Sequence, residues 1–323
     1  MSRFALPLQT RGLGELALAD APDALVFLFG LVTQLGDQWF FFVAFTSLYW
    51  LCRPRITARP RRTAAAFVGL ALGSLALVTA LKVGFALPRP PTATVADAPA
   101  WPSPLSDLFV SFTTDDGFGF PSGHALGTTV VYGAAVSLLD VWDRRRRLVA
   151  AAAVVGTVSL SRIFLGVHYG VDIVVGVLLG LVFLKAVFSV AAADDPDAAG
   201  HLDPARLFAI AAGLSVLALA VVFTTGVPGH TENAAAALGG SLGGLVGWTR
   251  LADHESLPTL SPPVALVAFL GAGGLWVGVD VVDAPVPVTV TVLATGAVVA
   301  FILVAPKLQG RIGLGDGATQ RAD

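Results

Sequence analysis

Long apolar stretches recur along almost the whole length of this 323-residue chain, and they constrain its fold more than any other feature. A stretch of about 17 to 25 apolar residues is enough for one α-helix to cross the hydrocarbon core of a bilayer. Only 13% of the residues are charged, whereas an ordinary soluble domain has roughly 25%. The sequence therefore predicts an all-α fold, a polytopic bundle of transmembrane helices. A membrane β-barrel is disfavoured, because its strands would alternate apolar and polar residues.

The apolar segments predict nine membrane spans. They lie near residues 38–52, 63–87, 124–139, 148–164, 172–190, 207–224, 234–248, 264–279 and 286–304. The apolar region that begins at Ala24 is too long for one straight crossing, and Gly36, Asp37 and Gln38 interrupt it. We therefore expect an interfacial or re-entrant segment before the first span. Near the other end of the chain, glycine recurs every fourth residue at 239, 243 and 247, which predicts close helix packing within the chain or in a dimer.

The orientation of the bundle follows from its basic residues, because short loops rich in Arg and Lys tend to stay cytoplasmic. Five arginines between residues 53 and 62 join the first two spans, and Arg144 to Arg147 join the third and fourth. With both loops inside, the loop of residues 88–121 and the turn of residues 161–172 face the other side. We expect an integral protein of the cell membrane whose polar clusters lie on the extracytoplasmic side.

The first polar cluster contains Lys82 and Arg89. A lysine so close to an apolar span is costly unless it is paired or functional. Arg89 follows seven residues later, which is two helical turns if the helix continues as far as Pro88, and both cations would then point the same way. Alone, the pair would be explained by cations at a membrane interface. A functional pair would indicate an anion or a water-filled cavity at this helix end.

The second cluster is Pro121-Ser122-Gly123-His124, directly before an apolar helix. Ser122 offers a hydroxyl group, and the unpaired backbone N–H groups at a helix start, including that of Gly123, attract an anion. The motif by itself also fits a simple turn before a helix. A phosphate group is the anion that suits such a site.

The third cluster contains Ser161, Arg162, His168 and Asp172. His168 and Asp172 are four residues apart, so we expect them on one helical face, with the carboxylate accepting a hydrogen bond from one ring nitrogen. The other nitrogen is then unprotonated and nucleophilic. A turn would bring the Arg162 guanidinium over the same phosphate. The alternative is a capped helix start with a purely structural pair.

In this order, K-x6-R-P, P-S-G-H and S-R-x5-H-x3-D resemble the signature of the type-2 phosphatidic acid phosphatases, the PAP2 superfamily. That signature is shared by bacterial lipid and polyprenyl pyrophosphate phosphatases and by glucose-6-phosphatase. The resemblance covers roughly residues 38–190. It implies a PAP2-type core of about six helices, to which further C-terminal transmembrane helices are added.

The resemblance also implies a role for each matched residue. His168 attacks phosphorus while Asp172 orients its ring, and His124 protonates the departing oxygen and then activates water against the phosphohistidine. The phosphate-binding residues are Lys82, Arg89, Ser122, Gly123 and Arg162. No metal and no other cofactor is expected, because fixed cations take the part that Mg²⁺ plays in other phosphoryl-transfer enzymes.

We divide the chain into four expected parts. They are an N-terminal interfacial or re-entrant segment (1–37), a PAP2-type catalytic membrane core (38–200, or as far as 224), a C-terminal transmembrane extension (201–305) and a cytoplasmic tail (306–323). The histidines of the extension, at positions 201, 230 and 254, lack metal-ligand spacing and are expected to be solvated loop residues. Asp115 and Asp116 are expected to form a turn or to disfavour anionic competitors.

The predicted function is metal-independent hydrolysis of a phosphate monoester or pyrophosphate on a membrane lipid, such as phosphatidic acid or a polyprenyl pyrophosphate. A phosphotransferase with an alcohol acceptor would use the same residues. A non-catalytic transporter or lipid-binding protein would need the cations but not a positioned His168. Vanadium-dependent haloperoxidases share the signature, but they are soluble, so the apolar pattern argues against them. The expected partners are a lipid phosphate and membrane lipids, without nucleic acid; the lipid and the oligomeric state stay open.

Overall fold

The structure is a computed structural model that describes residues 21–51, 55–95, 98–193, 202–227, 230–250, 254–280 and 286–312. Within these ranges the regular secondary structure is entirely helical, so the predicted all-α bundle is confirmed. The elements are α2 (Asp23–Thr33), η1 (Gln34–Gly36), α3 (Gln38–Leu51), α4 (Pro60–Phe85), η2 (Pro91–Thr94), α5 (Ser103–Thr113), α6 (Gly123–Leu138), α7 (Arg144–Phe164), α8 (Gly170–Val190), α9 (Pro204–Thr225), α10 (Thr231–Thr249), α11 (Pro262–Asp280) and α12 (Val288–Ile312).

Five described helices are long and apolar enough to cross a membrane, namely α4, α7, α8, α9 and α12. The segments Asp23–Gly36 and Gln38–Leu51 qualify together as a sixth span, bent by 51°. The bend lies at Asp37, where the sequence predicted an interruption. Among the described residues, the predicted spans at 124–139 and 234–248 do not meet this criterion. The helix α6 has only 16 residues, and α10 is diluted by five glycines, a glutamate and an asparagine. The predicted span at 264–279 lies partly outside the residues whose side chains the structure describes, so the predicted number of nine spans stays a prediction.

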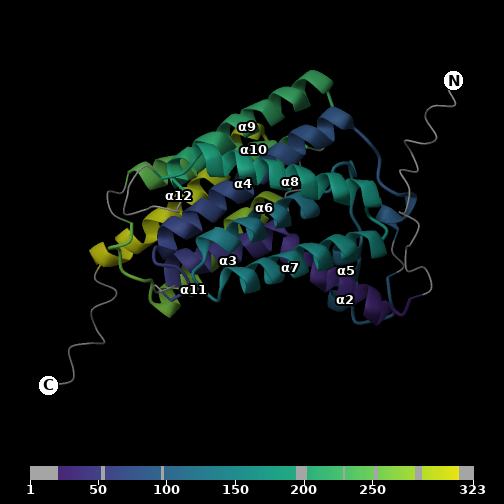
Figure 1. Cartoon of the computed structure of the whole chain (residues 1–323), viewed down its shortest axis with the longest axis horizontal. Helices are drawn as coiled ribbons and strands as arrows, with labels where there is room; N and C mark the ends of the chain where they lie inside the picture. The colour runs from purple at the N-terminus through teal and green to yellow at the C-terminus, as the bar shows by residue number, and fades with distance from the viewer. Residues whose placement is uncertain are drawn as a thin grey trace.

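The helix α4 lies at the centre of the bundle. In its most apolar window 72% of the residues are buried, against 22% in α7 and in α8. It contacts α3, α6, α9 and α10, and Figure 1 shows these long helices running side by side. The outer helices α7 and α8 expose large apolar side chains such as Val149 and Val182, as helices that face lipid do. The end of α4 that carries Lys82 therefore lies inside the bundle.

One end of the bundle is covered by short helices. The helix α5, which the sequence prediction left inside a long loop, packs against α2, and α2 packs against α7. Figure 1 shows α2 and α5 together beside one end of α7. Phe27 of α2 stacks on Phe109 and Phe112 of α5. This cap holds the N-terminal segment against the end of α7 that carries Arg162.

Arginine and histidine side chains tie the C-terminal extension to the core at the opposite end. Arg61, at the start of α4, donates hydrogen bonds to the carbonyl groups of His254, Glu255 and Pro258. The His254 ring stacks on Trp248 with centroids 3.7 Å apart, and its Nδ1 lies 2.8 Å from the Tyr49 hydroxyl. The prediction that His254 is a solvated loop histidine is therefore wrong. The corresponding prediction for His201 falls outside the described residues.

The glycine repeat packs α10 against α12 within the chain. A Cβ atom added at Gly243 would lie 2.0 Å from the carbonyl oxygen of Gly296, and one added at Gly239 would lie 2.2 Å from the Val292 carbonyl oxygen. Such backbone contact is possible only without side chains. The predicted close helix packing is thus an intramolecular contact, and α10 also contacts α4 and α9.

We expect Gly243→Ala to destabilise the protein, because the added methyl group would force α10 and α12 apart. Overpacking of this kind costs about 1 to 3 kcal/mol. The apparent melting temperature of the detergent-purified variant should fall by several degrees relative to the parent chain. The control is Gly213→Ala on α9, where a Cβ would meet nothing within 4 Å. Equal melting temperatures for the two variants would contradict the contact.

Candidate active site

The three polar clusters come together at one end of the bundle. One cavity is lined by Lys82 from the last turn of α4, by Gly123 and His124 from the first turn of α6, and by His168 from the loop before α8. Asp37 and Asp115 line the same cavity. Arg89 contacts His168 and Asp115, and Arg162 contacts Asp115. Both arginines therefore lie beside the cavity. The sequence-predicted site residues are therefore neighbours in space.

His168 is oriented by Asp172, but not through a shared helical face. The helix α8 begins at Gly170, so His168 precedes it, and the expected placement of both residues on one helix is wrong. Asp172 is a capping residue in the first turn, and its Oδ2 accepts the Tyr169 backbone N–H at 3.0 Å. The same oxygen lies 3.4 Å from His168 Nδ1. The capping turn thus fixes the carboxylate beside the ring, with both side chains buried.

The hydrogen-bond partners of His168 determine which ring nitrogen carries the proton. Arg89 Nη1 lies 3.0 Å from His168 Nε2, and a guanidinium group can only donate. Nε2 must therefore present its lone pair, and the proton sits on Nδ1, facing Asp172. Burial lowers the pKa of His168 well below its ordinary value, and the nearby Arg89 and Arg162 cations lower it further. The ring is neutral, with a nucleophilic nitrogen on the cationic side.

Arg89 reaches the site through a loop and not along a helix. The helix α4 ends at Phe85, so the condition that it continues to Pro88 is not met. The guanidinium group is held by two carbonyl groups, with Nε 2.6 Å from the Asp116 oxygen and Nη1 3.0 Å from the Val167 oxygen. These bonds aim the side chain at His168.

Asp115 bridges the two arginines. Its Oδ1 lies 2.9 Å from Arg89 Nη2, and its Oδ2 pairs with Arg162 Nη2. Burial opposes ionisation of this carboxyl group, but Arg162 and Arg89 outweigh burial and hold the pKa of Asp115 below its ordinary value. A phosphate group that binds both guanidinium groups must displace this carboxylate. The sequence predicted that Asp115 forms a turn or disfavours anionic competitors, and it did not predict the pairing of Asp115 with both arginines.

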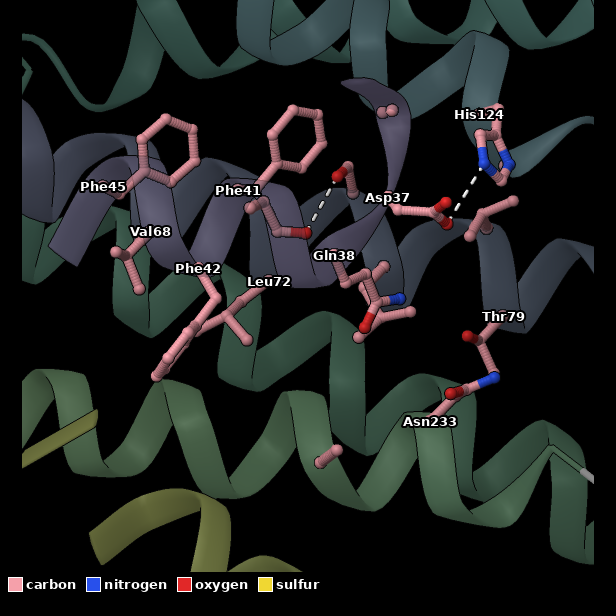
Figure 2. A pocket seen from close by; sticks show the side chains of 18 of the residues that line it. Asp37, Gln38, Phe41, Phe42, Phe45, Val68, Leu72, Thr79, His124 and Asn233 are labelled. Atoms are coloured by element: carbon pink, nitrogen blue, oxygen red, sulfur yellow. Dashed lines mark hydrogen bonds and ion pairs between the residues drawn. The ribbon is translucent and has the colours of Figure 1, made fainter. Parts of the chain in front are cut away.

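A second histidine–carboxylate pair joins His124 to Asp37. His124 Nε2 lies 3.2 Å from Asp37 Oδ1, and Figure 2 shows the two side chains pointing toward each other. Asp37 stands at the bend between η1 and α3. The bend approaches α6 closely, since a Cβ atom added at Gly36 would lie 3.0 Å from His124 Cδ2. The sequence signal for Asp37 was an acid at the break of an apolar span, which was interpreted only as an interruption.

Ser122 and Gly123 form the start of α6. The Ser122 side chain is buried and caps the helix, with its Oγ accepting the Ala125 N–H at 3.4 Å. Its own N–H donates to the Asp172 backbone oxygen at 3.0 Å, which links the starts of α6 and α8. Gly123 lines the cavity beside His124. A side chain there would meet only Val78, at 3.7 Å.

His230 is a further residue of this cavity. It lies directly before α10, is 9% exposed and stacks on Phe118 with centroids 5.3 Å apart. Burial lowers the pKa of His230, and the charge of Lys82 lowers it further. The prediction of a solvated loop histidine is wrong here too. Its sequence neighbourhood gave no signal, because its position depends on how α10 packs against α4.

Comparison with known proteins finds similarity in the central part of the chain. Residues 62–195 match the PAP2 superfamily. An 80-residue segment is 34% identical to lipid A 4'-phosphatase of Bacteroides thetaiotaomicron, covering 24% of this chain and 34% of that protein. An 87-residue segment is 30% identical to phosphatidylglycerophosphatase B of Bacillus subtilis, covering 25% of this chain and 43% of that protein. The chain thus matches less than half the length of these relatives. No solved structure matches it.

The matched region contains the three signature clusters but not the whole cavity. Lys82, His124 and His168 lie inside residues 62–195, whereas Asp37 and His230 lie outside. The cavity is therefore lined by residues from inside and outside the matched region.

We expect Asp115→Asn to bind inorganic orthovanadate more tightly than the parent chain, because the two arginines lose their competing carboxylate. Removal of the negative charge of Asp115, which lies in contact with both arginines, predicts about a tenfold lower Kd for orthovanadate. Isothermal titration with the detergent-purified protein measures it. The control is Asp116→Asn, which leaves the backbone bond to Arg89 in place. Unchanged or weaker binding by Asp115→Asn would contradict the competition.

Proposed function

Because residues 62–195 form a PAP2 superfamily region, we propose that this integral membrane protein is a phosphatase that removes phosphate from a lipid through His168. One observation carries the proposal, namely the fixed orientation of the His168 ring between Asp172 and Arg89. Binding an anion needs only cations, whereas a buried, neutral and oriented imidazole is what nucleophilic catalysis needs. The phosphatase names of the two relatives support the same reaction class.

Binding begins with an exchange of anions. The substrate phosphate displaces the Asp115 carboxylate, and Arg89 and Arg162 bind its non-bridging oxygens through charge-assisted hydrogen bonds. Lys82 adds a third positive charge from the end of α4. The Gly123 N–H, at the start of α6, and the Ser122 hydroxyl complete the phosphate site. As Arg89 turns to the phosphate, His168 Nε2 becomes free to attack.

The first chemical step transfers the phosphoryl group to His168. Nε2 forms a bond to phosphorus as the bond to the lipid oxygen breaks, and Asp172 stabilises the imidazolium that results. His124 donates its proton to the departing oxygen. Burial and the charge of Arg162 disfavour the protonated form of His124, and the Asp37 carboxylate opposes both and favours the donating form before this step. The cations stabilise the negative charge that develops on the phosphoryl oxygens.

The second step returns the enzyme to its starting state. His124, now neutral, removes a proton from a water molecule, which attacks the phosphohistidine. The phosphorus–nitrogen bond breaks, inorganic phosphate leaves and His168 recovers its lone pair. No step requires a metal ion, because fixed cations hold the phosphoryl oxygens. If an alcohol takes the place of water, the same steps describe a phosphotransferase.

The site is expected on the extracytoplasmic side. The helix α7 begins with Arg144 to Arg147 and ends near Arg162. Its 21 residues span about 30 Å at 1.5 Å per residue. An arginine-rich helix start that stays in the cytoplasm places Arg162 across the bilayer. Suitable substrates are phosphatidic acid, a phosphatidylglycerol phosphate and a polyprenyl pyrophosphate.

The proposal predicts phosphate release from a panel of these lipids by the purified protein in excess EDTA. His168→Ala should lose at least about 10³-fold in kcat/KM, because it removes the nucleophile. The variant should still bind orthovanadate, since the cations are intact, and this binding serves as the folding control. An assay with and without an alcohol acceptor separates hydrolysis from transfer. Metal-dependent turnover, or full activity in His168→Ala, would contradict the mechanism.

Asp37→Asn is expected to slow hydrolysis of an alkyl phosphate by about tenfold, because His124 loses the partner that favours its acidic form. The alkaline limb of the pH profile of kcat/KM should move to lower pH. Hydrolysis of p-nitrophenyl phosphate should be nearly unaffected, since p-nitrophenolate leaves without a proton. Asp23→Asn, an acid in the first turn of α2, is the control. An equal loss on both substrates would contradict a role in protonating the leaving group.

A further inference from the structure

The active-site cavity continues into the bundle, away from the phosphate-binding residues. Its volume is about 240 Å³. Beyond Lys82 and His124 the walls become mostly apolar, with lining residues Phe41, Phe42, Phe45, Val68, Leu72 and Val299, although the Thr46 and Ser74 hydroxyl groups also lie there. Figure 2 shows this change directly, with Asp37, His124, Thr79 and Asn233 at one end and Phe42, Phe45 and Val68 at the other. The cavity therefore has a polar head and an apolar body.

The wall that α4 gives to the cavity is longer than the hydrocarbon layer of one leaflet is thick. Along α4 its lining residues run from Lys82 to Val68, which is about 21 Å of helix axis at 1.5 Å per residue. Half the hydrocarbon core of a bilayer is about 15 Å thick. A lipid chain whose phosphate lies at His168 thus has room along this wall. The Ser74 hydroxyl, which lies on the way, already donates to the Ala71 carbonyl group.

Helices outside the matched region close the cavity. Asn233 and Ala236 come from α10, and Val299 and Ile302 come from α12. Both helices follow residue 195, where the match to the superfamily ends. Their relative position is fixed by the glycine contact at Gly243 and Gly296. The C-terminal extension is thus joined to the active site by a shared wall.

We propose that the apolar body of this cavity binds one hydrocarbon chain of the lipid whose phosphate reacts at His168, and that α10 and α12 select that chain by its shape. The inference rests on the proposed phosphatase function. Transfer of a chain from the bilayer to an apolar cavity adds little affinity, because lipid tails are as apolar as the walls. Its effect is to position the phosphate for attack. If a hydrocarbon chain does not fit the cavity, the phosphorus atom of that lipid is held away from His168 Nε2.

Ala236→Phe tests the wall that the C-terminal extension provides. The larger side chain would narrow the cavity, and a steric conflict of this kind predicts about a tenfold lower kcat/KM for long-chain phosphatidic acid. Hydrolysis of p-nitrophenyl phosphate, which has no chain, should stay within about twofold. Leu242→Phe, on the same helix at a position that is 42% exposed, should match the parent chain on both substrates. Parent-like hydrolysis of the long-chain lipid by Ala236→Phe would overturn the inference.

Photo-crosslinking locates the chain without relying on turnover. The full-length His168→Ala protein in vesicles is exposed to phosphatidic acid that carries a diazirine at the end of one acyl chain. Labels are expected in α3 between Phe41 and Thr46 and in α12 near Val299, and orthovanadate should abolish them. Labels confined to α7 and α8 would overturn the inference. So would equal labelling of the cavity by a diazirine-bearing diacylglycerol, which has no phosphate.

The two experiments distinguish the inference from the proposed function. If the parent chain releases phosphate from no lipid, the function is wrong, and the crosslinks still decide whether the cavity holds a chain. If hydrolysis proceeds while the labels lie outside the cavity, the function stands and only the inference fails. If Ala236→Phe loses hydrolysis of both phosphatidic acid and p-nitrophenyl phosphate, the crosslinks decide: labels inside the cavity support the inference, and labels confined to α7 and α8 overturn it.

Discussion

The structure depends above all on how His168 is held between a donor and an acceptor. Arg89 can only donate to Nε2, and the ionised Asp172 can only accept from Nδ1, so the neutral ring has one tautomer. Both partners come from loops or helix ends, and the ring between them is buried. The helix starts of α6 and α8 are linked by a hydrogen bond from the Ser122 N–H to the Asp172 backbone oxygen. His168, the proposed nucleophile, and His124 are therefore held next to each other by the same contact.

The acidic residues near His168 compensate the positive charges of the neighbouring arginines. Cations buried without partners would cost more than a folded bundle can tolerate. Asp115 occupies Arg89 and Arg162 together, and an incoming phosphate offers them an equivalent set of oxygens. The carboxylate therefore compensates the two cations in this structure, and in the proposed mechanism the substrate phosphate takes its place. Asp37 lies beside His124 in a comparable way. His168 and His124 thus each have a neighbouring carboxylate, Asp172 and Asp37.

The C-terminal extension gives the site surroundings that the matched region lacks. The cavity wall contains Ala236 of α10 and Val299 of α12, and His230 lies at its polar end. These helices are kept in place by glycine contacts and by the bonds from Arg61 to the loop before α11. The cavity thus joins residues of the matched region to residues that precede and follow it. A superfamily signature describes the reaction class, while the added helices shape the space beside it.

The sequence alone determined the helical membrane fold, the break at Asp37 and the three signature clusters, because apolar periodicity, helix starts and basic loops are local signals. Only the tertiary structure decided how these side chains contact one another and that Asp115 joins them. Arg89 meets His168 across 79 residues and Asp115 meets Arg162 across 47. Such contacts depend on how helices pack, and no short-range pattern encodes them. For the same reason His168 contacts Asp172 through a capping turn instead of a helical face, which spacing by itself does not distinguish.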